Sequence, residues 1–496
     1  MRVRLTIIFL LVYISQGICQ GINNNWLMGY ESFGGIPFGI TKFDFNSGSP
    51  LISYDSLEME FRHTHANISD SNGNLLFYTN GHYVADATND TMLNGGGLNL
   101  GAYANAFSAG LQIPQGAIVI PKPSSSSNYY IFHLSIDNYP DPTGSSSYKL
   151  LKTEIDMTLN GGLGAVISKN QVVINDTLNI GKITACKHAN GRDWWVVVHK
   201  ANSNTFYKLL ILPSVILGPY VQTIGSVRLR DDGQAKFSPD GKKYAYFCSL
   251  SAGLDILDFD RCSGLFSNWI NDQISVTPGT NVGCEFSSNS NLLYVSNLYN
   301  IYQYDLLSPN ITSSKIIVAT WDSFFQPGSP SLHALLCFPQ LAPDGKIYIT
   351  TGNSTTYFGR IENPNTLGIT CNVAQHSVLL PTYNFNTLPN HPNYFLECDT
   401  TLGCGCLTSL ENITDKDFTI KSSPNPTTGI CKLQFPVHSI EGMIEVYDLL
   451  GNKVLEEYIS PWSQFKSLDL INFPKGIYMC KLNWKDHTGN IKIIKQ

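Results

Sequence analysis

One hairpin signature recurs along most of the chain, and this repetition is the feature that most restricts the fold. In each copy a run rich in β-branched and aromatic residues meets a short polar turn, and a second such run follows. The six copies lie at residues 67–78, 117–132, 183–199, 235–248, 284–295 and 340–350. They begin at intervals of roughly 50 to 65 residues, which is near the period of propeller blades. The repetition therefore predicts an all-β body built as a β-propeller.

The turns inside these copies have a specific chemistry. In the Ser-Pro-Asp-Gly sequence at residues 238–241 the proline fixes φ at the second turn position, and the glycine accepts the positive φ that ends the turn. The Ala-Pro-Asp-Gly sequence at residues 342–345 repeats this arrangement. Because no amphipathic segment of helix length interrupts the series, we expect hairpins arranged around a ring.

The number of blades depends on how the ring closes. We expect seven blades, with six as the alternative, in a domain of residues 20–397. The runs at residues 26–30 and 38–45 could pair with residues 378–395 and complete the last blade. A series of β-sandwiches fits the pattern less well, because sandwiches rarely repeat one hairpin so evenly.

Composition excludes several classes of function. Only 14% of residues are charged and 11% are aromatic, with 41 Gly and 25 Pro, which is typical of a turn-rich, extracellular β protein. The formal net charge of −6 offers no basic surface to a polyanion, so we expect no nucleic-acid partner. Beyond the N-terminus no stretch reaches the roughly 18 apolar residues of a spanning helix, so we expect no transmembrane segment in the mature chain.

The N-terminus has the pattern of a secretory signal. Arg2 and Arg4 precede an apolar run at residues 5–14, and small residues follow at the cleavage positions. This predicts a signal peptide at residues 1–19, cleaved before Gln20.

The chain has 12 cysteines, of which the predicted cleavage leaves eleven. The residue before Cys19 is Ile18, whereas a lipoprotein signal needs a small residue there, so ordinary cleavage is favoured. Exported cysteines tend to pair, but the pairing cannot be read from the sequence. Cys398, Cys404 and Cys406 lack the paired Cys-x-x-Cys spacing of a zinc site, which leaves a local disulfide or free thiols.

A second β-rich module occupies residues 419–496, after a linker at residues 398–418 that lacks β periodicity. It opens with Ser-Pro-Asn-Pro-Thr-Thr-Gly from Ser423 and ends with Lys-Ile-Ile-Lys-Gln from Lys492. Between these lie Ile-Glu-Val-Tyr-Asp-Leu-Leu-Gly-Asn-Lys-Val from Ile444 and Pro-Lys-Gly-Ile-Tyr-Met-Cys-Lys-Leu from Pro474. In this order and position the motifs resemble the type A sorting domain of the Bacteroidetes type IX secretion system, also called the Por secretion system.

This resemblance implies a fold, a route and a partner. Such a domain is a small immunoglobulin-like sandwich of about seven strands. After Sec export to the periplasm it is recognised by the outer-membrane translocon and usually cleaved, which leaves the cargo free or tethered at the cell surface. The alternative is a carbohydrate-binding sandwich without a sorting role. The residues that match the motif are Pro424, Asn425, Pro426, Gly429, Tyr447, Gly451, Gly476, Tyr478, Lys492 and Lys495.

Stretches of the body, spread over most of residues 60–395, also resemble uncharacterised surface or secreted proteins of the same phylum. One of them is Leu-Pro-Asn-His-Pro-Asn-Tyr at residues 388–394. The resemblance implies a propeller but brings no assigned chemistry.

Few residues suggest a metal or a cofactor, and we expect neither. His63 and His65 lie two apart, as on one face of a strand, but a surface strand explains them better than a metal site. His188 and His199 flank one hairpin turn without facing each other, so we expect no shared metal there. The Asp-Ser-Asn-Gly-Asn sequence from Asp70 has its glycine too early for a calcium loop, which favours a hairpin turn.

Two functions remain open for the body. The first is a binding or interaction module for glycans or surface partners, since propellers often serve as recognition platforms. The alternative is an extracellular glycan hydrolase or lyase whose carboxylates converge at the mouth of the channel. The sequence contains no catalytic motif and gives no catalytic residue, which favours binding over enzyme activity.

Overall fold

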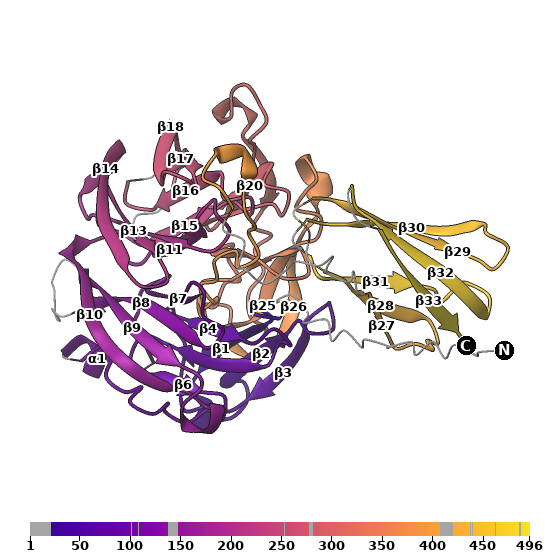
Figure 1. Ribbon diagram of the computed structural model, residues 1–496, viewed down its shortest axis with the longest axis horizontal. Coiled ribbons are helices and arrows are strands. Elements are labelled where there is room, and N and C mark those ends of the chain that lie inside the picture. The colour runs from indigo at the N-terminus through magenta and orange to yellow at the C-terminus, as the bar shows by residue number, and fades with distance from the viewer. Residues whose placement is uncertain are drawn as a thin grey trace, which may run out of the picture.

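The computed structural model describes residues 21–100, 102–107, 109–136, 147–251, 253–276, 281–406, 420–436, 438, 440–461, 463–485 and 488–496. The predicted signal peptide and residues 407–418 of the predicted linker lie outside the described residues. Figure 1 shows a ring of β-sheets with a smaller, elongated β domain beside it.

The body is a β-propeller made of seven consecutive antiparallel sheets. The first two have three strands: β1 (Asn25–Tyr30), β2 (Gly39–Asp44) and β3 (Leu51–Asp55); then β4 (Ala66–Ser69), β5 (Leu75–Thr79) and β6 (Val84–Asp86). The third and fourth sheets have four strands each: β7 (Ala117–Pro121), β8 (Asn128–Ile136), β9 (Ser147–Asp156) and β10 (Ala165–Leu178); then β11 (Thr184–Lys187), β12 (Trp194–His199), β13 (Ser203–Ile211) and β14 (Ile216–Arg228).

The last three sheets of the ring also have four strands each. They are β15 (Gly233–Phe237), β16 (Lys243–Cys248), β17 (Gly253–Asp260) and β18 (Leu265–Gln273); β19 (Gly283–Phe286), β20 (Leu292–Ser296), β21 (Asn300–Asp305) and β22 (Ile316–Thr320); and β23 (Pro339–Leu341), β24 (Ile347–Ile349), β25 (Thr355–Ile361) and β26 (Val373–Asn384). The short helical elements are α1 (Ala102–Ala106), η1 (Ser32–Gly34), η2 (Asn160–Gly162), η3 (Thr312–Ser314), η4 (Gly368–Cys371) and η5 (Thr400–Leu402).

Each of the six predicted hairpins is the pair of strands that begins a sheet. The pairs are β4–β5, β7–β8, β11–β12, β15–β16, β19–β20 and β23–β24. The first strand of each sheet lies next to the first strand of the following sheet, so these strands line the centre of the ring. The last strands, such as β14 and β18, are largely exposed. The recurring signature therefore marks the inner half of each sheet.

The ring closes differently from the expected strand pairing. Strands β1 and β2 pair with each other and with β3 as a separate sheet, while β26 pairs with β25. The two sheets instead pack face to face: the ring of Trp26 lies 5.8 Å from that of Tyr348, and Phe43 lies 5.7 Å from it. The reason is that β3, and not β26, supplies the third strand of the first sheet. The first and seventh sheets are therefore joined by aromatic packing and do not share strands.

The smaller domain is a two-sheet β-sandwich. One sheet contains β27 (Lys421–Ser423), β28 (Ile430–Gln434) and β31 (Phe465–Asp469); the other contains β30 (Lys453–Ile459), β29 (Gly442–Tyr447), β32 (Gly476–Asn483) and β33 (Thr488–Lys495). Inward and outward residues alternate along β29 and β32. The inward side chains form a core of their own. Within the described residues, no helix of the chain has the length and apolar character needed to cross a membrane.

Candidate functional site

A segment that follows the last strand of the ring fills the centre of the propeller. We call residues 385–397 the plug. Its Asn390 donates from Nδ2 to the carbonyl oxygens of Ala117 (3.0 Å) and Ile183 (2.9 Å). Tyr394 donates from its hydroxyl to Val119 O at 2.8 Å. The plug thus satisfies carbonyl groups that belong to different sheets around the ring.

The plug also carries a buried histidine. His391 Nε2 lies 2.9 Å from Asn67 Oδ1 and 3.1 Å from Asn67 O. Burial lowers the pKa of His391 to about 3, so the imidazole is neutral and Nε2 donates to Asn67. Residues 378–395 were expected to pair with the N-terminal runs, but the strand ends at Asn384 and the residues after it enter the centre of the ring.

His63 and His65 are not on a surface strand, contrary to the sequence-based interpretation. His65 is buried and His63 is half-buried, and β4 begins only after them. His63 packs its ring edge against Phe385 of the plug at 5.2 Å, and His65 lies 4.5 Å from the ring of Phe61. Desolvation lowers the pKa of His63 to about 4 and holds that of His65 well below its usual value. These imidazoles are neutral packing groups around the plug.

A pocket of about 100 Å³ lies between one end of the plug and the inner strands. Lys236 of β15 donates to Gln340 of β23 and forms an ion pair with Glu285 of β19, with 3.1 Å between Nζ and Oε2. The Glu285 carboxylate also accepts hydrogen bonds from the backbone N–H groups of Phe286 (2.9 Å) and Leu341 (3.1 Å). Among the described residues that line this pocket, Glu285 is the only carboxylate, and its charge is already compensated.

The rest of the pocket lining mixes apolar side chains with amides, hydroxyl groups such as those of Ser238 and Ser288, and the His391 imidazole. Phe237 and Phe395 provide aromatic walls, and Asn393 contributes a side-chain amide. Asn23 also lines the pocket, and its buried Oδ1 has no hydrogen-bond partner in the protein. Among the described residues, the pocket therefore offers at least one unused polar atom beside aromatic walls, a combination suited to holding a small polar group.

The second β domain lies at this end of the propeller. Pro461, in the loop between β30 and β31, is part of the pocket lining. A Cβ placed on Gly345 would lie 3.2 Å from Ser460 Cβ, which shows how closely this loop approaches the turn before β24. Next to this contact, a polar crevice of about 680 Å³ separates the two domains.

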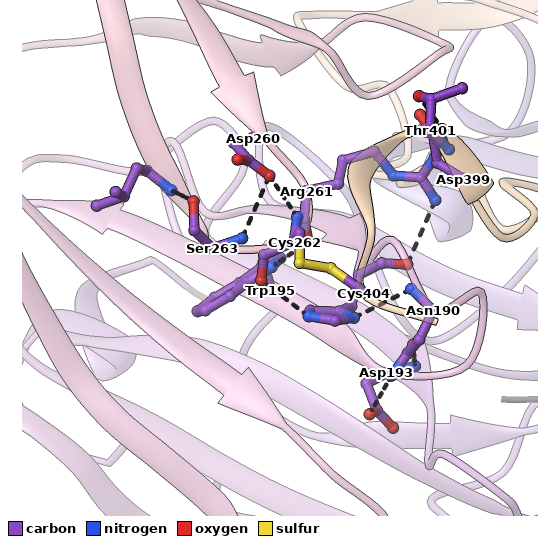
Figure 2. Close-up of a disulfide and its surroundings, with 12 residues drawn as sticks. Asn190, Asp193, Trp195, Asp260, Arg261, Cys262, Ser263, Asp399, Thr401 and Cys404 are labelled. Atoms are coloured by element: carbon purple, nitrogen blue, oxygen red, sulfur yellow. Dashed lines mark hydrogen bonds between the residues drawn. A yellow bond between two sulfur atoms is a disulfide. The ribbon is translucent and has the colours of Figure 1, made fainter. Parts of the chain in front are cut away.

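Two disulfides hold the chain where it leaves the plug. Cys398 pairs with Cys406, and Cys404 pairs with Cys262, which follows β17. Figure 2 shows the Cys262–Cys404 bridge with Arg261 beside it. Arg261 Nη2 donates to the carbonyl oxygen of Glu397 at 2.6 Å. The first residues of the predicted linker, 398–406, are therefore fastened to the propeller.

His188 lies beside this bridge, and proximity alone would group it with the two cysteines as metal ligands. The arrangement does not fit a metal site, because the disulfide uses both sulfur atoms. Nε2 of His188 also donates to Cys262 O at 2.9 Å, and Nδ1 accepts from Asn190 N at 3.1 Å. His199 takes no part in this cluster. Its ring is buried against Phe206, and desolvation lowers its pKa to about 3. In the register of this hairpin Lys187 lies opposite Trp194 and Thr184 lies opposite Val197, so His188 and His199 do not face each other, as expected.

The Asp70 turn is a hairpin turn, as expected. Asp70 Oδ1 accepts from the backbone N–H groups of Asn72 and Asn74, each at 2.8 Å. Its oxygens thus close the β4–β5 turn.

The two ends of the predicted sorting motif lie side by side. Asn425 donates from Nδ2 to Lys492 O at 2.7 Å and accepts from Ile494 N at 2.9 Å. Lys495 Nζ donates to Thr428 O at 2.7 Å. Pro424, Pro426 and Gly429 belong to the same connection between β27 and β28, so the opening motif is tied to the last strand.

The remaining motif residues shape turns and core. Tyr478 is buried and donates its hydroxyl to Pro474 O at 2.7 Å. Gly451 takes φ +84° in the turn between β29 and β30, where L side chains are strained. Tyr447 ends β29 and Gly476 begins β32. The motif residues thus account for the connections that define this sandwich.

Comparison with known proteins assigns the second domain. Residues 423–496 match the secretion system C-terminal sorting domain, four residues inside the expected start at 419. The chain is therefore cargo of the type IX secretion system, exported to the cell surface or the medium. No curated protein matches the chain.

Solved structures with a similar body share little sequence with it. A protein from Lactobacillus plantarum has 11% identity and a TM-score of 0.43, covering 74% of this chain and all (100%) of its own. A functionally unknown protein from Desulfotomaculum acetoxidans has 12% identity and a TM-score of 0.40, covering 74% and 99%. The periplasmic gluconolactonase of Pseudomonas aeruginosa has 11% identity and a TM-score of 0.38, covering 73% and 98%.

Proposed function

We propose that residues 20–397 form an extracellular binding module for glycans, and that the central pocket holds the end group of the ligand. The observation that supports this proposal is that the Glu285 carboxylate is isolated from other acids and already bound by neighbouring groups. Hydrolysis or lysis of a glycan by paired carboxylates needs a second acid about 5 to 10 Å away. In the described part of the chain the pocket lining supplies Glu285 alone, and Lys236 with two backbone N–H groups already engages it.

Recognition needs less than catalysis, and the pocket has the groups for it. The unpaired Oδ1 of Asn23 can accept a hydroxyl or amide proton, and Phe237 and Phe395 can face the C–H groups of a sugar.

A glycan array and a hydrolysis screen on the secreted chain test this function. We expect binding of at least one glycan without turnover. Asn23→Ala should weaken that binding about tenfold, because one hydrogen bond in a desolvated pocket is lost. Asn72→Ala, in an exposed turn, is the matched control and should bind normally. Turnover of a bound glycan, or full affinity in Asn23→Ala, would contradict the proposal.

A further inference from the structure

A row of aromatic rings runs along the surface where the sixth and seventh sheets meet. Tyr299, in the turn between β20 and β21, lies 5.9 Å from Trp321, which follows β22. Trp321 lies 5.2 Å from His333, and His333 lies 6.0 Å from Phe325. We call these four residues the ring row. Tyr299 is 47% exposed and Phe325 43%, so both ends of the row reach solvent.

The loop that carries the ring row is held in one shape. Phe325 and His333 face each other as a β-bridge, and Trp321 N donates to Tyr299 O at 2.7 Å. Phe324, next in sequence, stacks on His376 of β26 with 4.0 Å between ring centroids. These contacts fix the rings before any ligand arrives, which reduces the entropy lost on binding.

A depression of about 450 Å³ lies within this loop, at residues 322–330. Its volume is in the usual range of small-ligand sites. Asp322, Ser323 and Gln326 place polar side chains beside Phe324 and Phe325.

The charges of the loop indicate which ligand fits. Asp322 is the only acid between residues 321 and 334, and no lysine or arginine lies there. The Asp322 carboxylate is paired with His376, at 2.8 Å from Nε2. Without a cationic side chain in the loop, a uronic acid or sulfated sugar has no partner for its charge. A neutral sugar fits better: its C–H face packs on an aromatic ring and its hydroxyls bond to amide and carboxylate oxygens.

We infer that the ring row is a second glycan-binding site, which takes a neutral saccharide chain along its exposed rings. The inference rests on the proposed function but concerns a different surface from the central pocket. The site lies outside the pocket and is not covered by Pro461.

Affinity electrophoresis of the secreted chain in gels that contain laminarin, xylan or galactomannan tests the inference. Phe325→Ala and Tyr299→Ala should each weaken binding to a retarding polysaccharide about tenfold, and the double variant should migrate as in a plain gel. Phe33→Ala is the matched control, because Phe33 is an aromatic residue with 85% exposure elsewhere on the propeller. Equal thermal unfolding of all variants shows that the exposed rings do not support the fold.

The outcomes separate the two proposals. Loss of retardation in the ring-row variants, with Asn23→Ala unaffected, supports the ring row and contradicts the pocket. Loss only in Asn23→Ala overturns the ring row and leaves the proposed function intact. If none of the three neutral polysaccharides retards the wild-type chain, the ring row is overturned, while glycan binding on the array would still support the pocket.

Discussion

Amide side chains make the decisive hydrogen bonds at the centre of the propeller. Gln115 donates from Nε2 to Ala235 O and accepts at Oε1 from Ala235 N, both at 2.9 Å. The same Nε2 lies 3.2 Å from Asn390 Oδ1. An amide can donate and accept at once and carries no charge to desolvate, so it suits a site walled by backbone groups. Nothing in the sequence indicated the central position of Asn390, because an asparagine in a segment without periodicity cannot be distinguished from an ordinary loop residue.

Buried histidines give the stability of the protein a definite pH dependence. Desolvation lowers the pKa of His63 and His133 to about 4 and that of His199 and His391 to about 3. An unfolded imidazole titrates near 6.5, so below that pH the unfolded chain binds more protons than the folded chain. Asp232, whose pKa burial raises to about 6, opposes this trend by one proton.

We therefore expect the free energy of unfolding to fall as the pH drops from about 6.5 towards 4. Each neutral histidine contributes a slope of about 1.4 kcal/mol per pH unit in that window, and the contribution is fully retained above it. Urea unfolding at pH 7, 6, 5 and 4.5 measures the slope. His133→Gln should reduce the slope by the contribution of one histidine, about 1.4 kcal/mol per pH unit. A free energy that does not vary with pH would show that these imidazoles are protonated in the folded protein.

At the scale of elements, the plug is held at both ends by different means. Strand β26 leads into it, and the disulfides at Cys398–Cys406 and Cys262–Cys404 hold its exit. The sequence separations are 8 and 142 residues. Closing the longer loop lowers the conformational entropy of the unfolded chain more. In the chain-entropy treatment this stabilises the folded protein by about 5 kcal/mol, against about 2.5 kcal/mol for the shorter loop.

Cys404→Ser should therefore destabilise the protein more than Cys406→Ser. The expected losses are several kcal/mol and about 2 kcal/mol, and reductant should remove the difference between each variant and the wild type. Guanidinium unfolding with and without reductant measures both. An equal loss in the two variants would indicate that local strain, rather than loop closure, sets the effect.

The sequence predicted the inner hairpins well and the rest of each sheet less well. Turns such as residues 238–241 are local, so their chemistry alone places β15 and β16. The plug depends on contacts between distant residues, such as Asn390 with Ala117, which no local pattern reveals. The burial of His65 depends on the plug as well, so the surface assignment was wrong for the same reason.

At the scale of the whole molecule, the two domains meet beside a polar crevice. Lys432 Nζ lies 3.3 Å from Ser47 Oγ, and the crevice of about 680 Å³ lies beside it. The sandwich has its own core, so it can be removed without opening the core of the propeller. The sorting domain and the proposed binding module are thus separate domains.

Deleting residues 423–496 should retain a folded propeller in the periplasm. The translocon loses the domain it recognises, whereas the plug and both disulfides stay in place. Immunoblots of periplasm, cell surface and medium measure the distribution, and thermal unfolding of the periplasmic form checks the fold. The matched control is a full-length chain with a neutral insertion at residues 407–418, which should be exported as before. Truncated protein in the medium at the wild-type level would contradict the sorting role.

The position of the plug in the sequence determines the order in which the propeller can fold. The middle of the ring is filled by residues 385–397, which emerge from the inner membrane after every sheet of the propeller and before the sorting domain. A chain still in transit can pair its hairpins, but its central carbonyl groups keep no partner until the final fifth arrives. The propeller therefore completes its centre shortly before the sorting domain becomes available to the translocon. A chain whose export stops before residue 385 lacks both the plug and the sorting domain.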